Sequence, residues 1–203
     1  EFEDFTVNYN EKSGSDYDHR GYGFLIYNGD RFERTRLNNF TNIVASHNSE
    51  TGVYIQGLDR CDGLPDDLCY TDDVLQNKFR NITSTFNNQG IYLQNAIEEG
   101  GGIYDSIASN NTESGLYLRG YDGGEIDGGV YSYNKIGIYV KDDDYLINNV
   151  TASHNTKYGI YVTGDDNKIY NSIISNNGPV LTTYTGDIPV AQINSISSHD
   201  VTH

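Results

Sequence analysis

Residues 128–162 read GGVYSYNKIGIYVKDDDYLINNVTASHNTKYGIYV and contain one short phrase twice, 22 residues apart. The phrase is a glycine, an aliphatic residue, a tyrosine and a second aliphatic residue. It occurs five times in the chain, starting at Gly52, Gly90, Gly115, Gly137 and Gly159. A second phrase of alternating character that ends in asparagine precedes each copy, as in the stretch 150–155, VTASHN. Self-similarity of this kind is typical of a solenoid.

Period-2 alternation in both phrases predicts two short strands in each repeat, with turn residues between them. The chain lacks the Leu-x-x-Leu-x-Leu pattern of a leucine-rich horseshoe and has no helical periodicity. A parallel β-helix stacks equivalent residues about 4.8 Å apart, so asparagines in one column can hydrogen-bond from coil to coil. The sequence therefore predicts an all-β, right-handed parallel β-helix with coils of about 22 residues.

Charge excludes several classes of partner. The 203 residues carry 13 Lys and Arg against 29 Asp and Glu, a formal net charge of −16. This charge repels phosphate backbones, so we expect no nucleic-acid partner.

No apolar run approaches the roughly 18 residues of a membrane span, and we expect no membrane insertion. We interpret residues 1–203 as one β-helix domain whose first and last coils are incomplete. We therefore expect it to be a fragment of a longer chain that contains further domains.

An inserted loop interrupts the repeat. The 38 residues between Gly52 and Gly90 exceed one coil and place the insertion at residues 57–78. Cys61 and Cys69 lie in it, within a stretch that contains Pro and several Asp. We expect a disulfide between them, which implies an oxidising compartment and an extracellular or cell-surface location. Two free surface thiols are the alternative.

The alternation also predicts an exposed face. It turns the aliphatic residues of the five-fold phrase inward and its tyrosines outward. The expected tyrosine column is Tyr54, Tyr92, Tyr117, Tyr139 and Tyr161, and Gln56, Gln94, Arg119, Lys141 and Thr163 follow two residues later on the same face. Aromatic rings beside amides and cations suit a polysaccharide or other glycan, with the rings stacking on pyranose faces. The alternative is that the tyrosines pack on one another, as aromatic residues do in sheets.

Acidic residues recur at one coil position. Asp143 and Asp144 are followed 22 residues later by Asp165 and Asp166. Stacked carboxylates repel, so these turns are either solvated or hold a hard cation such as calcium. The sequons at Asn39, Asn81, Asn110 and Asn149 follow from the coil pattern and would carry glycans only in a source that glycosylates.

Most of the chain resembles the catalytic β-helix of secreted mannuronan C-5-epimerases. The resemblance in phrase order and coil length runs from Gly128 to Asn177, and residues 4–10, DFTVNYN, resemble an early coil. The stretch 21–24, GYGF, resembles the lead-in to the active site of those enzymes. The resemblance implies the β-helix fold and a polysaccharide substrate.

The same resemblance implies that epimerase chemistry is missing. In the family the lead-in continues Asp-Pro-His, and a further Asp stands before a glycine one coil later. Here Leu25, Ile26 and Tyr27 follow the lead-in, and Thr51 stands at the later position. Epimerisation needs one group to remove a proton and another to return one, which Leu25 cannot do. We expect no mannuronan epimerisation.

A different set of groups could support polysaccharide β-elimination. The candidate catalytic residues are Tyr22, His19, Arg20 and Tyr27, which lie close together in the sequence. An Arg or His can neutralise a uronate carboxylate, and a Tyr or His can act as base and acid. The alternative is a solvated, charged turn. Two functions follow: a secreted protein that recognises or modifies an extended polysaccharide, as a lyase or C-5-epimerase type if it is an enzyme, or a non-catalytic structural or adhesive module of a cell surface or virion.

Overall fold

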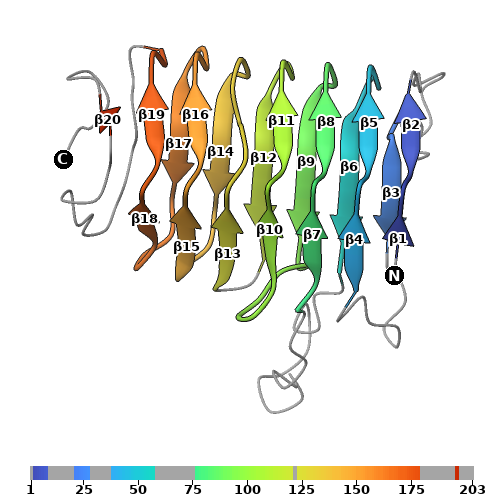
Figure 1. The fold of residues 1–203 in the computed structure, drawn as a ribbon, viewed down its shortest axis with the longest axis horizontal. Helices are drawn as coiled ribbons and strands as arrows, with labels where there is room; N and C mark the ends of the chain where they lie inside the picture. The colour runs from blue at the N-terminus through green and yellow to red at the C-terminus, as the bar shows by residue number, and fades with distance from the viewer. Residues whose placement is uncertain are drawn as a thin grey trace, which may run out of the picture.

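The computed structural model describes residues 2–8, 21–27, 38–57, 76–120, 123–178 and 195–196, and every regular element in these ranges is a β-strand. The strands pair in parallel and form sheets that run along the stack, one of them interrupted at a single coil (Figure 1). A typical coil contributes one strand to each of three faces. The described part of the chain is therefore a parallel β-helix, and it contains no helix that could cross a membrane.

The three faces are named sheets A, B and C. Sheet A contains β1 (Phe2–Glu3), β4 (Asn39–Thr41), β7 (Lys78–Arg80), β10 (Gly102–Tyr104), β13 (Gly124–Asp127), β15 (Tyr145–Asn148) and β18 (Lys168–Tyr170). Sheet B contains β2 (Thr6–Asn8), β5 (Val44–Ser46), β8 (Thr83–Thr85) and β11 (Ile107–Ser109), then, after a break, β16 (Thr151–Ser153), β19 (Ile173–Ser175) and β20 (Ser195–Ile196). Sheet C contains β3 (Phe24–Tyr27), β6 (Thr51–Gln56), β9 (Gln89–Gln94), β12 (Ser114–Arg119), β14 (Ile136–Val140) and β17 (Tyr158–Val162).

The prediction of two strands per repeat is wrong, because sheet A supplies a third. The two predicted phrases correspond to sheets B and C. The strands of sheet A are short, and in the middle coils each turns one apolar side chain inward: Phe40, Phe79, Ile103 and Ile126. One buried residue per strand leaves no alternation for sequence reasoning to detect.

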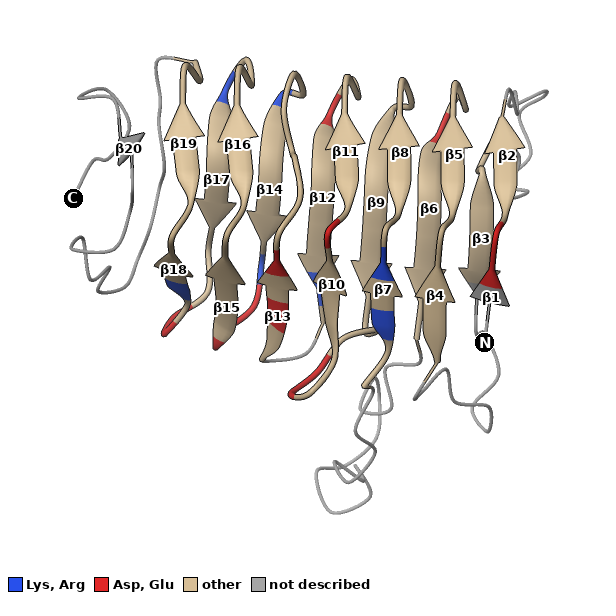
Figure 2. Ribbon diagram, in the orientation of Figure 1, with Lys and Arg blue, Asp and Glu red and all other residues tan. Residues whose placement is uncertain are grey.

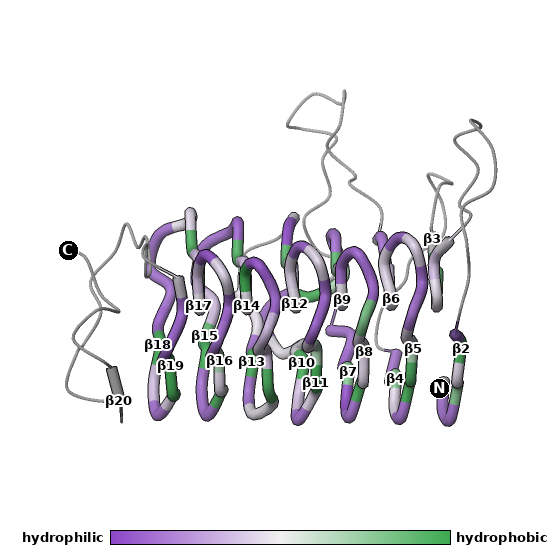
Figure 3. The backbone as a smooth tube through the Cα atoms, turned by 90° about the horizontal axis from the view of Figure 1, so that it is seen from above, coloured by the Kyte–Doolittle hydropathy of each residue, from purple (hydrophilic) through white to green (hydrophobic). Residues whose placement is uncertain are grey.

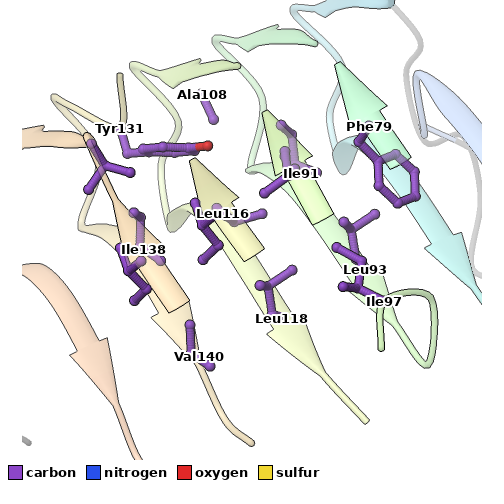
Figure 4. Packing of buried hydrophobic residues seen from close by; sticks show 14 of the residues in the cluster. Phe79, Ile91, Leu93, Ile97, Ala108, Leu116, Leu118, Tyr131, Ile138 and Val140 are labelled. Atoms are coloured by element: carbon purple, nitrogen blue, oxygen red, sulfur yellow. The ribbon is translucent and has the colours of Figure 1, made fainter. Parts of the chain in front are cut away.

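The core is a set of columns that run through the coils (Figure 4). In sheet C the two aliphatic residues of each phrase point inward, as predicted: Val53, Ile91, Leu116, Ile138 and Ile160, and then Ile55, Leu93, Leu118, Val140 and Val162. In sheet A the rings of Phe40 and Phe79 stack with centroids 4.7 Å apart. Hydrophobic and hydrophilic stretches alternate around every coil (Figure 3). Each fully buried Leu or Ile contributes about 1.5–3 kcal/mol of transfer free energy.

An asparagine column, buried except at Asn177, closes the turn between sheets B and C. Its members, called the Asn column below, are Asn48, Asn87, Asn111, Asn134, Asn155 and Asn177. The Oδ1 atom of Asn134 accepts hydrogen bonds from the backbone N and the Nδ2 of Asn111, at 2.9 and 3.1 Å. Its own Nδ2 donates to the carbonyl of Ala108 at 2.9 Å. The predicted coil-to-coil bonding is confirmed. In the coil where the second phrase reads IASN at residues 107–110, the column member is Asn111 and not Asn110.

The four sequon asparagines are all exposed. Asn81 and Asn149 lie in the turn from sheet A to sheet B, and Asn110 lies in the turn after β11. All three have a left-handed backbone, with φ between 52° and 58°. Asparagine tolerates this conformation better than most residues, so the turn geometry accounts for its abundance here.

One coil departs from the pattern in sheet B, where Val130 makes only isolated bridges to Ile107 and Thr151. The next residue, Tyr131, is fully buried at a position held by Ala108 and Ala152 in the adjacent coils. A phenol ring needs far more room than a methyl group, and we attribute the shortened pairing to it. Its hydroxyl has no hydrogen-bond partner in the part of the chain that the structure describes.

The predicted disulfide lies outside the described residues. Cys61 and Cys69 fall within the range 58–75, between Gly57 at the end of β6 and Gln76 ahead of β7. The pairing stays a prediction. The predicted insertion, residues 57–78, extends too far at its C-terminal end, because Lys78 is the first residue of β7 and belongs to the next coil.

Candidate functional site

The tyrosine column forms on the outer face of sheet C. Tyr54, Tyr92, Tyr117, Tyr139 and Tyr161 are direct partners in the strand register, and each is half-buried. Consecutive ring centroids lie 4.7–4.9 Å apart. The spacing follows from the separation of parallel strands, which brings equivalent side chains into contact.

Ring orientation divides this column into two parts. Tyr92 stacks on Tyr54 and on Tyr117 with interplanar angles of 16° and 12°. Tyr139 is turned by 60° from Tyr117 and by 48° from Tyr161. In the stacked part the ring faces cover one another, so an incoming sugar meets ring edges and cannot stack on those faces as expected from the sequence. Ring edges carry partial positive charge and suit oxygen lone pairs.

A groove of about 490 Å³ runs beside the column over five coils. Tyr54, Tyr92, Tyr117 and Tyr139 line it, whereas Tyr161 does not. The remaining lining residues are Tyr22, Glu50, Thr51, Gln89, Glu113, Ser114 and Ile136. The groove is long and shallow enough for an extended chain, and its lining is largely polar.

The second wall of the groove comes from residues that the sequence interpretation missed. Glu50 and Glu113 stand two positions before a repeat glycine, and Thr51, Gln89 and Ser114 stand one position before. Aligning the repeats on that glycine would have found them, because equivalent positions share one wall of a β-helix. The Glu113 carboxylate also pairs with Lys135 Nζ at 2.7 Å.

The amides predicted beside the column contact it directly. The Tyr92 hydroxyl donates to Gln94 Oε1 at 3.1 Å, and the Tyr54 hydroxyl donates to Gln56 in the same way. Arg119 follows Gln94 in the same row of sheet C. Its side chain is exposed, as are those of Lys141 and Thr163.

Two tyrosines of the groove, Tyr92 and Tyr117, have raised pKa values. Burial raises the pKa of Tyr92, and the positive charge of Arg119 offsets part of that rise. Burial also raises the pKa of Tyr117, and the neighbouring hydroxyls of Tyr92 and Tyr139 add to the effect. Both phenols are therefore neutral at physiological pH and can donate hydrogen bonds.

The candidate catalytic residues are only partly placed. Tyr22 lines the end of the groove, and its ring meets the ring of Tyr54 edge-on with centroids 5.3 Å apart. Tyr27 ends β3, where it pairs with Gln56, and its side chain lies outside the described part. His19 and Arg20 are also outside the described residues. Leu25 pairs with Tyr54, so it stands at the head of the tyrosine column.

The acidic turns are organised by backbone hydrogen bonds. Asp143 Oδ1 accepts from the backbone N of Asp165 at 2.6 Å, and Asp142 Oδ2 accepts from the backbone N of Gly120 at 2.6 Å. Asp144 and Asp166 are exposed and have left-handed φ angles of 60° and 52°. No group of three or more His, Cys, Asp or Glu is placed to hold a metal ion among the residues that the structure describes. The calcium site stays a prediction without support from this geometry.

Comparison with known proteins identifies the coil repeat. A sequence model for the right handed beta helix region matches residues 68–200, more than half of the chain. No curated protein and no solved structure matches the chain.

Proposed function

The chain belongs to the right-handed β-helix family, and from that premise and the groove on sheet C we propose that it binds an extended polysaccharide along the tyrosine column. The observation that carries this proposal is the groove itself. It follows four in-register tyrosines across the coils, and polar side chains form its other wall. Ligand sites are usually concave and combine hydrophobic or aromatic side chains with a few polar groups.

The binding mode follows from the ring geometry. Ring edges of Tyr54, Tyr92 and Tyr117 meet the polymer, while Gln89, Ser114 and Glu113 supply hydrogen-bond partners from the other wall. Cations gather toward the C-terminal coils, where Lys135 faces Glu113 and the exposed Arg119 and Lys141 follow the tyrosines. This uneven charge would favour one direction of the bound chain.

The test is binding of a panel of neutral and uronate polysaccharides by the full chain. Tyr117→Ala removes a ring at the centre of the groove and should weaken binding about tenfold. Tyr161→Ala is the matched control, because it removes a ring of the same column outside the groove. Equal affinities for both variants and the wild type would contradict the proposal.

Chemical modification of the polysaccharide is a second candidate, supported by the position of Tyr22 in the groove. A phenol at that place can transfer a proton to or from a bound sugar, as β-elimination or epimerisation requires. Ultraviolet absorbance of an unsaturated product would reveal a lyase, and proton NMR of mannuronan would reveal epimerisation. Loss of either signal in Tyr22→Phe, with binding retained, would assign the role to Tyr22.

A structural or adhesive role is the remaining alternative. The mutual stacking of Tyr54, Tyr92 and Tyr117 favours it, since those faces already have partners. With either function we propose an extracellular or cell-surface location and a disulfide between Cys61 and Cys69. Mass spectrometry of the unreduced protein would test the disulfide.

A further inference from the structure

A second hollow lies on sheet A, on a different face of the coil from the tyrosine column. Its volume is about 790 Å³, and its lining comprises Lys78, Glu99, Gly100, Gly101, Tyr104, Gly123, Gly124, Glu125, Asp144 and Leu146. None of these residues lines the groove on sheet C. In Figure 2 basic colour on β7 and acidic colour on β13 lie on either side of β10.

A glycine interrupts an outward row of sheet A beside the hollow. Lys78, Gly102 and Glu125 are register partners on three adjacent strands. A Cβ atom at Gly102 would lie 2.6 Å from the Glu125 carbonyl and 2.7 Å from the Tyr104 hydroxyl, so only glycine fits. The Tyr104 ring thus leans over the position of the missing side chain.

Tyr104 links the basic and acidic sides of the hollow. The Arg80 guanidinium lies 4.3 Å from the centroid of its ring. Burial, together with the charge of Glu125, raises the pKa of Tyr104 and keeps the phenol protonated. The contact with Arg80 holds the ring in place as a wall of the hollow.

The mixture of charges selects the kind of ligand. The lining carries the three carboxylates of Glu99, Glu125 and Asp144 against the ammonium group of Lys78, so an anion is repelled. A neutral polyhydroxyl ligand can donate hydroxyl protons to the carboxylates and accept a hydrogen bond from the ammonium group. The volume is within the usual range for a small-molecule site.

We propose that this hollow is a second saccharide site, separate from the groove, which takes a neutral sugar residue. The chain would then hold carbohydrate on two faces, so one molecule could bridge two polysaccharide chains or two parts of one. Bridging adds avidity without any new contact, provided that both faces are engaged at once.

The test is NMR titration of the full chain with cellotetraose, maltotetraose, mannotetraose and galactotetraose, each added alone. At least one should shift the backbone amides of residues 100–102 and 123–125. Glu125→Gln should weaken that binding about tenfold and Lys78→Gln about threefold. Lys168→Gln is the matched control, because Lys168 occupies the same outward row of sheet A outside the hollow.

Tyr117→Ala separates the two sites and should leave these shifts unchanged. The proposal is overturned if none of the four sugars shifts these amides. It is also overturned if Tyr117→Ala abolishes the response, or if trigalacturonate or spermidine shifts the same amides more strongly than any neutral sugar.

Discussion

The Asn column and the tyrosine column both arise from a residue repeated at one coil position, but they differ in burial and in their contacts. Each places one identical side chain per coil at a fixed position, and each follows the stacking of parallel strands. All of the asparagines except Asn177 are buried, and the amide of Asn134, for example, bonds to the next coil and to a backbone carbonyl. The tyrosines are half-buried and contact one another mainly through their rings.

The difference shows what burial does to a repeated residue. A buried polar group must have all its partners within the protein, so each member of the Asn column is tied to two neighbours. A half-buried ring stack leaves edges and hydroxyls accessible, and those can serve a ligand. Stability therefore depends on the first column, and the proposed binding function on the second.

The most disruptive test of this contrast is Asn134→Ala. It removes the acceptor of two buried donors, the backbone N and Nδ2 of Asn111. We expect a loss of about 2–5 kcal/mol in the free energy of unfolding, since each unsatisfied buried donor costs about 1–3 kcal/mol. Urea unfolding measures it. Asn110→Gly, at an exposed left-handed turn, is the control and should change stability by no more than about 1 kcal/mol.

Alkaline pH should destabilise the protein through its tyrosines. Burial raises the pKa of Tyr131, Tyr92 and Tyr117 above the unfolded value of 10.0. The folded chain then retains protons that the unfolded chain releases, so stability is complete below pH 10 and falls as the pH rises further. The slope is at most about 1.4 kcal/mol per pH unit for each group. A melting temperature that stays constant from pH 9 to 11 would contradict this.

Tyr131→Phe tests whether a buried polar group without a partner lowers stability, here at a tyrosine inside the coil. Its hydroxyl is buried without a partner among the described residues, so removing the oxygen should stabilise the fold by about 1–2 kcal/mol. The variant should also lose part of the alkaline sensitivity. Calorimetry at pH 7 and pH 10.5 measures both effects, and a destabilised variant would reveal a partner for the hydroxyl.

Tyr117→Ala should have the smallest effect on stability. The ring is half-buried and its main contacts are the rings of Tyr92 and Tyr139. We expect a loss of about 0.5–1.5 kcal/mol, the contribution of an aromatic pair. Thermal unfolding measured on the same sample as the binding assay would show whether the column serves folding or recognition. A loss as large as that of Asn134→Ala would assign the column to stability alone.

Much of the β-helix could be predicted from the sequence because the fold repeats. The Gly-aliphatic-Tyr-aliphatic phrase carries its own alternation, so the inward position of residues such as Ile138 and Val140 and the outward position of Tyr139 were predictable. The asparagine that closes the turn was predictable for the same reason. In both cases the residues involved recur at one coil position, and stacking converts recurrence in sequence into contact in space.

Other features depend on tertiary structure, because they arise from residues that are not similar to one another. Sheet A was missed since its strands in the middle coils bury a single apolar side chain each, such as Phe79 in β7. The orientation of the tyrosine rings depends on packing between coils, which alternation does not specify.

The groove on sheet C and the hollow on sheet A show most clearly what could not be predicted from the sequence. The groove on sheet C needs Glu50 and Glu113 from turns to face the tyrosines, and the hollow on sheet A brings together Lys78 and Glu125 from strands on either side of β10. The sequence by itself determined the coil, the core columns and the outward tyrosines, because each depends on one periodic position. Only the tertiary structure decided where unlike side chains from different coils meet, since register and insertions of unequal length set those distances.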